Sequence, residues 1–223
     1  ALVDEYARRY LPEDTARFAY LLSRLKKSMT SLLCYLRDEQ NQSQFKPVAC
    51  ELKIGRGEDA VPGQVYRLSD GRTVQLVGTV DRADEWIEDD GTRWVRVVDY
   101  KTGAKRFDLA ELRYGLGLQM LLYLFTLRDE GGKLFGGYPI EPAGVLYLPA
   151  REKLLNLPRN ASEAEIERAM HKELQRSGMV LNDPAVLRAM EHSALEAPCY
   201  LPVRVKKSKD GVTEITGSIA TSA

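Results

Sequence analysis

Two aspartates and a lysine, Asp81, Asp99 and Lys101, stand at the ends of two neighbouring segments whose residues are typical of β-strands. Side chains alternate between the two faces of a strand, so Asp99 and Lys101 point the same way. A turn signal, Asp90-Gly91, separates the two segments and predicts that they pair as a hairpin. This pairing would bring Asp81 near Asp99.

Two carboxylates held close together repel each other unless a cation or a proton lies between them. Mg²⁺ suits such a place, because it binds oxygen ligands and is often held by one or two carboxylates, waters and a substrate phosphate. A lysine beside the ion could position or deprotonate a water, or stabilise charge on the phosphorus. A metal and a lysine together are suited to cleaving a phosphodiester bond.

The tripeptide acid-x-Lys carries little weight by itself. The chain holds 32 acids among 223 residues, and chance predicts about two such tripeptides, as found at Glu51–Lys53 and Asp99–Lys101. A surface ion pair at a strand end would explain Asp99 and Lys101 equally well if they stood alone. The apolar residues Val97 and Val98 before them favour a buried strand that delivers its end to a site.

The first half of the chain predicts a helix followed by an antiparallel meander. Apolar residues three and four positions apart predict a long amphipathic helix, capped by Asp14 or Thr15 and ended by the polar stretch 38–44. Strands are expected at 48–54, at 63–87 with a turn at Asp70-Gly71, and at 92–101.

The second half predicts helices around one more buried strand. A capping box at Asp108–Glu111 predicts a helix that continues to about Leu127. The apolar run 143–150 is of strand length, and Ser162–Glu165 could cap a further helix that reaches about residue 177. A short helix is expected from Pro184 and a last strand at 199–208. This order predicts an α/β fold whose central mixed sheet contains the antiparallel meander and is flanked by helices.

Composition excludes several classes of protein. Lysine plus arginine and aspartate plus glutamate both total 32, so any polyanion must be bound by a local patch or by a partner. No apolar run approaches the roughly 18 residues of a membrane span, and there is no G-x-x-x-x-G-K-[ST] loop of a nucleotide-binding ATPase. The basic residues that could contact phosphate, or could simply be solvated, are Lys105, Arg106, Arg113, Lys206, Lys207 and Lys209.

The hydrophobic content of 44% is enough for one large domain. The chain does not begin with methionine, which indicates a piece of a longer protein. We expect a single domain, 1–223, with a leading helical segment 1–40, a catalytic core 45–150 and an extension 151–223 of helices and a strand.

The three cysteines, Cys34, Cys50 and Cys199, have no C-x-x-C spacing and form neither a disulfide framework nor a metal knuckle. They are typical of thiols in a reducing cytoplasm, and Cys50 is expected in the core of its strand. The two histidines, His171 and His192, are expected on the surface of helical segments.

Three motifs occur in the order GTVDRAD, VVDYKTG and YGLGLQMLLYL. Together they resemble the PD-(D/E)XK nucleases of the RecB type, and most closely the C-terminal nuclease domain of AddB-type components of bacterial helicase–nucleases. The similarity extends to FKPVACELKIG, AGVLYLPA and SGMVLNDPAVLRAME. The resemblance implies a restriction-endonuclease-like core.

The resemblance also implies roles for individual residues. Asp81 and Asp99 match the metal-ligating acids, and the Tyr100 carbonyl is a possible further ligand. Lys101 matches the catalytic lysine. Glu51 resembles the upstream acid that completes the acidic cluster.

Gln119 and Tyr123 match the family motif on the following helix. Their spacing of four residues puts them on one helix face, from which they could orient the lysine or contact the DNA backbone. A buried polar pair tied to the sheet is the alternative. Gly115 and Gly117, which weaken a helix, indicate either a loose first turn or a close approach of the helix to the sheet or to phosphate.

The implied activity is Mg²⁺-dependent exonucleolytic hydrolysis of single-stranded DNA, with Mn²⁺ as a substitute ion, in double-strand-break end processing and recombinational repair. The implied partner is an AddA-like subunit in the bacterial cytoplasm, and no membrane is involved. AddB-type proteins carry an iron–sulfur cluster, whose cysteine ligands are absent from this chain. Some RecB-type sites use an upstream histidine ligand, for which no residue is present here. The alternative is an inactive nuclease fold that serves as a DNA channel or a subunit-docking scaffold.

Overall fold

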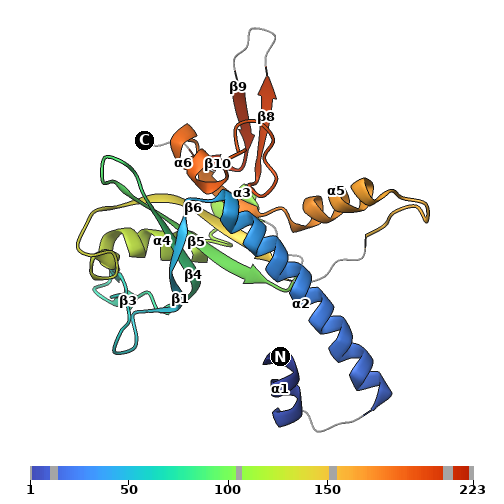
Figure 1. Cartoon of the computed structure of the whole chain (residues 1–223). Helices are drawn as coiled ribbons and strands as arrows, with labels where there is room; N and C mark the ends of the chain where they lie inside the picture. The colour runs from blue at the N-terminus through green and yellow to red at the C-terminus, as the bar shows by residue number, and fades with distance from the viewer. Residues whose placement is uncertain (1, 11–14, 104–106, 151–154, 208–212, 221–223) are drawn as a thin grey trace. The chain divides into compact units, whose positions relative to one another are not determined.

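The computed structural model describes residues 2–10, 15–103, 107–150, 155–207 and 213–220. The chain forms two compact units, residues 1–41 and 42–223 (Figure 1). The division at residue 41 lies close to the end of the predicted leading segment, 1–40. That residues 1–223 form a single nuclease domain remains a prediction.

The first unit is helical. It contains α1 (Leu2–Tyr10) and most of α2 (Ala16–Gln42), which are joined by an ion pair between Asp4 and Lys26. The helix predicted after residue 14 is therefore present, and the Thr15 hydroxyl caps it by accepting from the Phe18 N–H at 3.2 Å. Asp14, the other predicted cap, lies outside the described residues. The apolar stripe at spacings of four is largely exposed, at Leu21, Leu25, Met29 and Leu33.

The second unit is built on a six-stranded sheet in the order β1-β4-β5-β6-β7-β10. Pairing is antiparallel for β1–β4, β4–β5 and β6–β7 and parallel for β5–β6 and β7–β10, so the predicted mixed sheet is confirmed. The strands are β1 (Lys46–Ile54), β4 (Gly78–Ile87), β5 (Arg93–Lys101), β6 (Ile140–Pro149), β7 (Ser177–Leu181) and β10 (Ile219–Ala220).

Two small ribbons stand apart from this sheet, each made of two antiparallel strands. They are β2 (Val65–Arg67) with β3 (Thr73–Gln75), and β8 (Val203–Lys207) with β9 (Thr213–Gly217). The helical elements of the second unit are α3 (Leu109–Arg113), α4 (Gln119–Glu130), the 3-10 turn η1 (Gly131–Lys133), α5 (Glu163–Leu174) and α6 (Pro184–Met190).

Several predicted elements differ from the structure. The hairpin predicted at Asp70-Gly71 is present as β2 and β3. Its second strand, which was predicted to continue to residue 87, is wrong, because β3 ends at Gln75 and the separate strand β4 joins the meander with β1 and β5. The strand predicted at 199–208 is not the last, since β9 and β10 follow β8, and β7 was not predicted. The predicted helix at 162–177 ends at residue 174, although its capping box at Ser162 and Glu165 is present.

The continuous helix predicted from residue 108 to 127 is broken into α3 and α4. Asp108 caps α3 as predicted, its side chain accepting from the Ala110 N–H at 2.8 Å. The chain then turns through Gly115 and Gly117, whose φ angles are 77° and 70°. Only glycine adopts this left-handed region without strain, and a Cβ at Gly115 would meet no atom within 4 Å. The glycines therefore allow the turn between two helices, and close approach to the sheet does not explain them.

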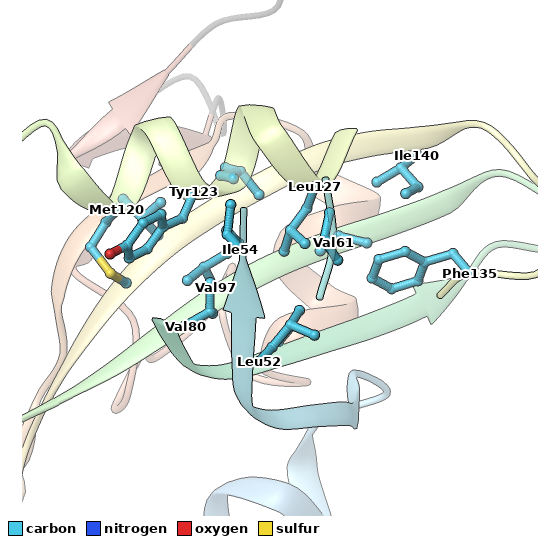
Figure 2. Packing of buried hydrophobic residues seen from close by; sticks show 14 of the residues in the cluster. Leu52, Ile54, Val61, Val80, Val97, Met120, Tyr123, Leu127, Phe135 and Ile140 are labelled. Atoms are coloured by element: carbon cyan, nitrogen blue, oxygen red, sulfur yellow. The ribbon is translucent and has the colours of Figure 1, made fainter. Parts of the chain in front are cut away.

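The core lies between α4 and one face of the sheet. In Figure 2, Met120, Tyr123 and Leu127 point from α4 toward Val97, Val80 and Ile54 of the strands beneath. Gly78 at the start of β4 makes room for this packing, because a Cβ there would lie 2.0 Å from the Tyr123 hydroxyl oxygen. Burial of apolar surface holds α4 over the strands that carry the predicted site residues. Among the described residues, none of the helices is long and apolar enough to cross a membrane.

Candidate active site

Three acids form one row across the sheet. Strand β4 pairs Arg82 with Val98 of β5, and β1 pairs Cys50 with Arg82. One further residue along these registers places Asp81 opposite Asp99 and Glu51 opposite Asp81. The row continues into β6, where Asp99 is paired with Tyr147. The hairpin predicted through Asp90-Gly91 is thereby confirmed; the catalytic roles of the acids stay a prediction.

Asp81 joins the two strands at the point where their regular pairing ends. Pairing between β4 and β5 ends at Arg82 and Val98. Beyond that point the Asp81 carboxylate accepts the Tyr100 N–H, with 2.8 Å between Oδ2 and N. A side chain thus takes the place of a strand partner. The bond fixes Asp81 beside the peptide that follows Asp99.

Asp99 and Lys101 lie together on one face at the end of β5. Their Oδ2 and Nζ atoms are 2.6 Å apart. Asp99 is only 8% exposed, whereas the Lys101 side chain is 27% exposed and its Nζ lies 5.6 Å from the centre of the Tyr147 ring. A carboxylate this deeply buried needs a cationic partner, and here the partner stands at the solvent side.

Tyr147 was not predicted as a site residue. Burial raises the pKa of its hydroxyl, and the carboxylates of Asp99 and Glu111 raise that pKa further. Tyr147 therefore stays neutral near pH 7 and adds no negative charge beside Asp99.

On the opposite face of the sheet, a buried network holds Tyr100. Arg82 donates from Nη1 to the Tyr100 hydroxyl at 2.9 Å and from Nη2 to Asp84 at 3.0 Å. Arg96 donates from Nε to the same Asp84 oxygen at 2.9 Å. Tyr100 is thus held at its amide by Asp81 and at its hydroxyl by Arg82. This network, which the sequence analysis missed, fixes the peptide between Asp99 and Lys101.

Glu51 has an unusual backbone. Its φ of 51° is the one positive φ among non-glycine residues of the described ranges. Such strain costs about 1–3 kcal/mol and concentrates at functional sites. Its neighbour Cys50, which was expected in the strand core, is exposed instead. Glu51 lies next to Asp81 in the row, and the role that the resemblance implies for it stays a prediction.

Gln119 and Tyr123 contact each other on the first turn of α4. Gln119 Nε2 donates to the Tyr123 hydroxyl at 2.8 Å. Tyr123 is buried in the core against Gly78, whereas Gln119 is exposed. Tyr123 therefore matches the buried alternative, and Gln119 is the member of the pair that solvent or a ligand can reach.

The histidines and cysteines lie outside the acid row. His171 on α5 is half-buried, and its Nδ1 lies 2.9 Å from the sulfur of Cys199. His192 lies in a turn after α6 and not on a helix as expected, although it is exposed. Within the part of the chain that the structure describes, no group of three or more His, Cys, Asp or Glu side chains could hold a metal ion by itself.

The candidate donors suit one kind of ion. Two carboxylates, Asp81 and Asp99, and the Tyr100 carbonyl are hard oxygen donors, and few in number. Mg²⁺ commonly takes only one or two protein carboxylates and keeps several waters. A structural zinc site would need four nitrogen or sulfur ligands. The donor set therefore fits Mg²⁺ or Mn²⁺.

Of the basic residues that could contact phosphate or could simply be solvated, Lys105, Arg106 and Lys209 lie outside the described residues. Arg113 is exposed at the end of α3. Lys206 is exposed on β8, where it is paired with Glu214 of β9. For Lys207, only the backbone is described.

Comparison with known proteins identifies the family of the chain. The model of the PD-(D/E)XK nuclease superfamily matches residues 1–202. An Anoxybacillus flavithermus protein, named as a subunit of an ATP-dependent helicase/deoxyribonuclease, is 34% identical over 206 residues, which are 92% of this chain and 18% of that protein. A protein of the same name from Symbiobacterium thermophilum is 33% identical over 214 residues, which are 95% of this chain and 18% of that protein.

The chain spans less than a fifth of the length of these relatives. The predicted resemblance and the predicted fold are both confirmed by the match over residues 1–202 and by the mixed sheet with its flanking helices. The chain belongs to the PD-(D/E)XK nuclease superfamily.

Proposed function

We propose that this chain is the catalytic domain of a Mg²⁺-dependent deoxyribonuclease that hydrolyses phosphodiester bonds of single-stranded DNA exonucleolytically. The observation that carries the proposal is the end of the β4–β5 hairpin. There Asp81 accepts from the Tyr100 amide, and Asp99 lies 2.6 Å from Lys101. Two acids and an ammonium group on adjacent strand ends match the chemistry of metal-assisted phosphodiester hydrolysis.

Asp81, Asp99 and the Tyr100 carbonyl are the residues that would hold the ion. A bound Mg²⁺ would supply polarisation of the scissile phosphate and a lowered pKa for a bound water. Glu51, next to Asp81 in the row, would complete the acidic cluster. The arginine network behind Tyr100 would keep these donors in place, because preorganised groups need no rearrangement when the substrate arrives.

Lys101 would act on the attacking water. It shares a face with Asp99 and stands at the solvent side, so its ammonium group can orient a water or take part in proton transfer at Nζ. It can also stabilise negative charge on the phosphate oxygens. Gln119, the exposed member of the α4 pair, would orient Lys101 or contact the DNA backbone, with Tyr123 holding its amide at 2.8 Å.

The direct test is cleavage of an end-labelled single-stranded oligonucleotide by the intact protein, with Mg²⁺ and with EDTA. Asp99→Ala should abolish Mg²⁺-dependent cleavage. Asp89→Ala is the matched control, because Asp89 is an exposed aspartate at the other end of the same hairpin. If Asp99→Ala cleaved as well as the control, the assignment would be rejected.

An inactive scaffold is the second candidate. The observation in its favour is that the described residues contain no group of three metal-binding side chains. Titration calorimetry with Mn²⁺ separates the two. A nuclease should bind the ion in a way that Asp81→Asn abolishes, whereas a scaffold should show no such site.

We infer the biological setting from the names of the relatives, which are subunits of ATP-dependent helicase/deoxyribonucleases. The proposed partner is an AddA-like subunit, and the proposed process is double-strand-break end processing and recombinational repair in a bacterial cytoplasm. An iron–sulfur cluster does not fit the described residues. Cys50 is exposed on β1, Cys199 contacts His171, and no group of three such ligands is present.

A further inference from the structure

We propose that a cleft adjoining Lys101 holds the phosphates of the DNA strand on one side of the scissile bond. The inference rests on the proposed function and adds to it the residues that bind the strand. The cleft has a volume of about 720 Å³ and is lined by Lys101, Tyr147, Lys172, Arg176, Ser177 and Arg204, among others. This volume lies within the roughly 300–1,000 Å³ of ligand pockets.

The cleft opens at the end of the sheet where the acids lie. Parallel strands β5 and β6 both end there, at Lys101 and Pro149, and antiparallel β7 begins there at Ser177. The last turn of α5 and the β8–β9 ribbon form its other walls. Figure 1 shows both as orange and red elements that follow β6 in the chain. Lys101 is therefore shared by the candidate active site and the cleft.

The charge of the cleft suits a phosphate backbone. Four lining side chains are cationic, those of Lys101, Lys172, Arg176 and Arg204, and Glu173 is the anionic one among the lining residues. The chain as a whole has no net charge. A cluster of cations in a concave site raises the local concentration of a polyanion, so this cleft provides the local basic patch that the composition requires.

Hydrogen bonds hold the residues that line the cleft in place. Arg176 is only 3% exposed, and its Nη1 donates to the Leu174 carbonyl at 2.9 Å. This bond places a cation at the C-terminal end of α5, where the helix dipole would otherwise repel an anion. Gln175 Nε2 donates to the Leu201 carbonyl at 2.8 Å and joins α5 to the segment before β8.

A buried carboxylate anchors the far wall. Glu191 is fully buried and accepts the backbone N–H groups of Cys199, Tyr200 and Leu201, at 2.6, 3.1 and 3.1 Å. Carboxylates that accept several backbone donors are held firmly. The segment that leads into the β8–β9 ribbon, on which Arg204 lies, is therefore held by Glu191.

The lining favours contact with the backbone of the strand. Tyr147 is the aromatic residue that lines the cleft, and it is only 3% exposed. Proteins that bind single strands through their bases do so by stacking them on exposed aromatic rings. Contacts that lysine and arginine make to phosphate oxygens read no sequence. We therefore expect binding in the cleft that does not depend on the base.

The first experiment measures protection of one lysine. The intact protein is treated with a lysine-acetylating reagent in EDTA, with and without a short oligothymidylate, and modification is read by mass spectrometry. Lys172 is exposed in the cleft, and Lys133 is exposed on η1 away from it. The oligonucleotide should protect Lys172 several-fold and leave Lys133 unchanged. Equal modification of Lys172 with and without the oligonucleotide would overturn the inference.

The second experiment measures salt dependence. Lys172→Ala combined with Arg204→Ala should weaken binding of the oligothymidylate in EDTA and lower the slope of log K against log salt by about 0.7 per lost contact. Matched controls are Arg168→Ala, one turn earlier on α5, and Arg188→Ala on α6, both exposed and outside the cleft. An unchanged slope in the double variant would also overturn the inference.

These outcomes are independent of the catalytic test. Metal-dependent cleavage that is lost in Asp99→Ala, together with unprotected Lys172, would support the proposed function and contradict binding of the strand in the cleft. Protection of Lys172 without any metal-dependent cleavage would support binding of the strand in the cleft and contradict the proposed function. Protection retained in the Asp99→Ala protein would support the cleft, because it separates strand binding from the acids.

Discussion

Two buried aspartates on adjacent strands have opposite surroundings. Asp84 in the middle of the β4–β5 ladder is fully buried and accepts from Arg82 and Arg96. Asp99, near the end of the ladder, is 8% exposed and has the partly exposed Lys101 as its ion-pair partner. The first acid is enclosed between two guanidinium groups. The second lies beside a cleft that solvent can enter.

The difference separates an acid that holds the fold from one that is available for chemistry. Breaking a buried ion pair is costly because it leaves an uncompensated charge in the interior. Removing an acid whose cationic partner reaches solvent costs less, because water can replace the lost carboxylate. The same side-chain type on the same hairpin should therefore affect stability at residue 84 and activity at residue 99.

The largest expected effect is on stability, from Asp84→Ala. This change removes the buried carboxylate that Arg82 and Arg96 share, so the free energy of unfolding should fall by about 3–5 kcal/mol. Chemical denaturation followed by circular dichroism measures the loss. Asp89→Ala, an exposed control, should change it by no more than about 0.5 kcal/mol. An equally small effect of Asp84→Ala would show that the network is not needed for folding.

Next is the effect of Asp99→Asn on catalysis. Cleavage of single-stranded DNA should fall by about 100-fold or more, because the ion that would stabilise charge in the transition state loses one of its proposed ligands. The free energy of unfolding should change by no more than about 1 kcal/mol, since Lys101 can reach water. Parallel kinetics and denaturation check both parts. A loss of stability as large as that of Asp84→Ala would erase the proposed distinction.

The third prediction concerns the glycine beneath α4. Gly78→Ala would place a Cβ 2.0 Å from the Tyr123 hydroxyl oxygen, and overpacking of this kind costs about 1–3 kcal/mol. Gly132→Ala is the control, because a Cβ there meets nothing within 4 Å. Combining Gly78→Ala with Tyr123→Leu should recover part of the loss. Strictly additive effects in this double-mutant cycle would contradict the contact.

The smallest expected effect is at the capping box of α5. Ser162→Ala removes the hydroxyl that accepts the Glu165 N–H at 3.3 Å and should cost about 0.5–2 kcal/mol, seen as faster amide exchange within α5. Glu163→Ala, in the same turn but outside the box, should cost less.

The capping box should also depend on pH. The backbone N–H of Ser162 bonds to Glu165 and lowers the pKa of that carboxyl below its ordinary value of 4.5, with the Ser162 hydroxyl adding to the effect. Its contribution to stability is thus present above that ordinary value and is lost as the pH falls through the lowered pKa. Amide exchange in α5 that does not vary in this acid range would contradict the role of Glu165.

Local signals predicted the elements that carry the acids. The turn at Asp90-Gly91 and the β-branched residues on either side sufficed for the β4–β5 hairpin, and the Ser162 capping box sufficed for the start of α5. The break between α3 and α4 was missed, although Gly115 and Gly117 were noted. A glycine within a helical pattern predicts a weaker helix, but it does not predict whether the chain turns there. Short β7 and β10 were missed because they are strands only by virtue of their neighbours.

The sequence by itself determined that Asp99 and Lys101 share a face, and it predicted that the Asp90-Gly91 hairpin brings Asp81 near Asp99. A period of two along a strand and the register of a short hairpin are local properties. Only the tertiary structure decided that Arg82 and Arg96 enclose Asp84, and that Lys172 and Arg204 line a cleft next to Lys101. Those cations come from different strands or from segments far along the chain. Burial and packing against the sheet bring them together, and no local pattern encodes that.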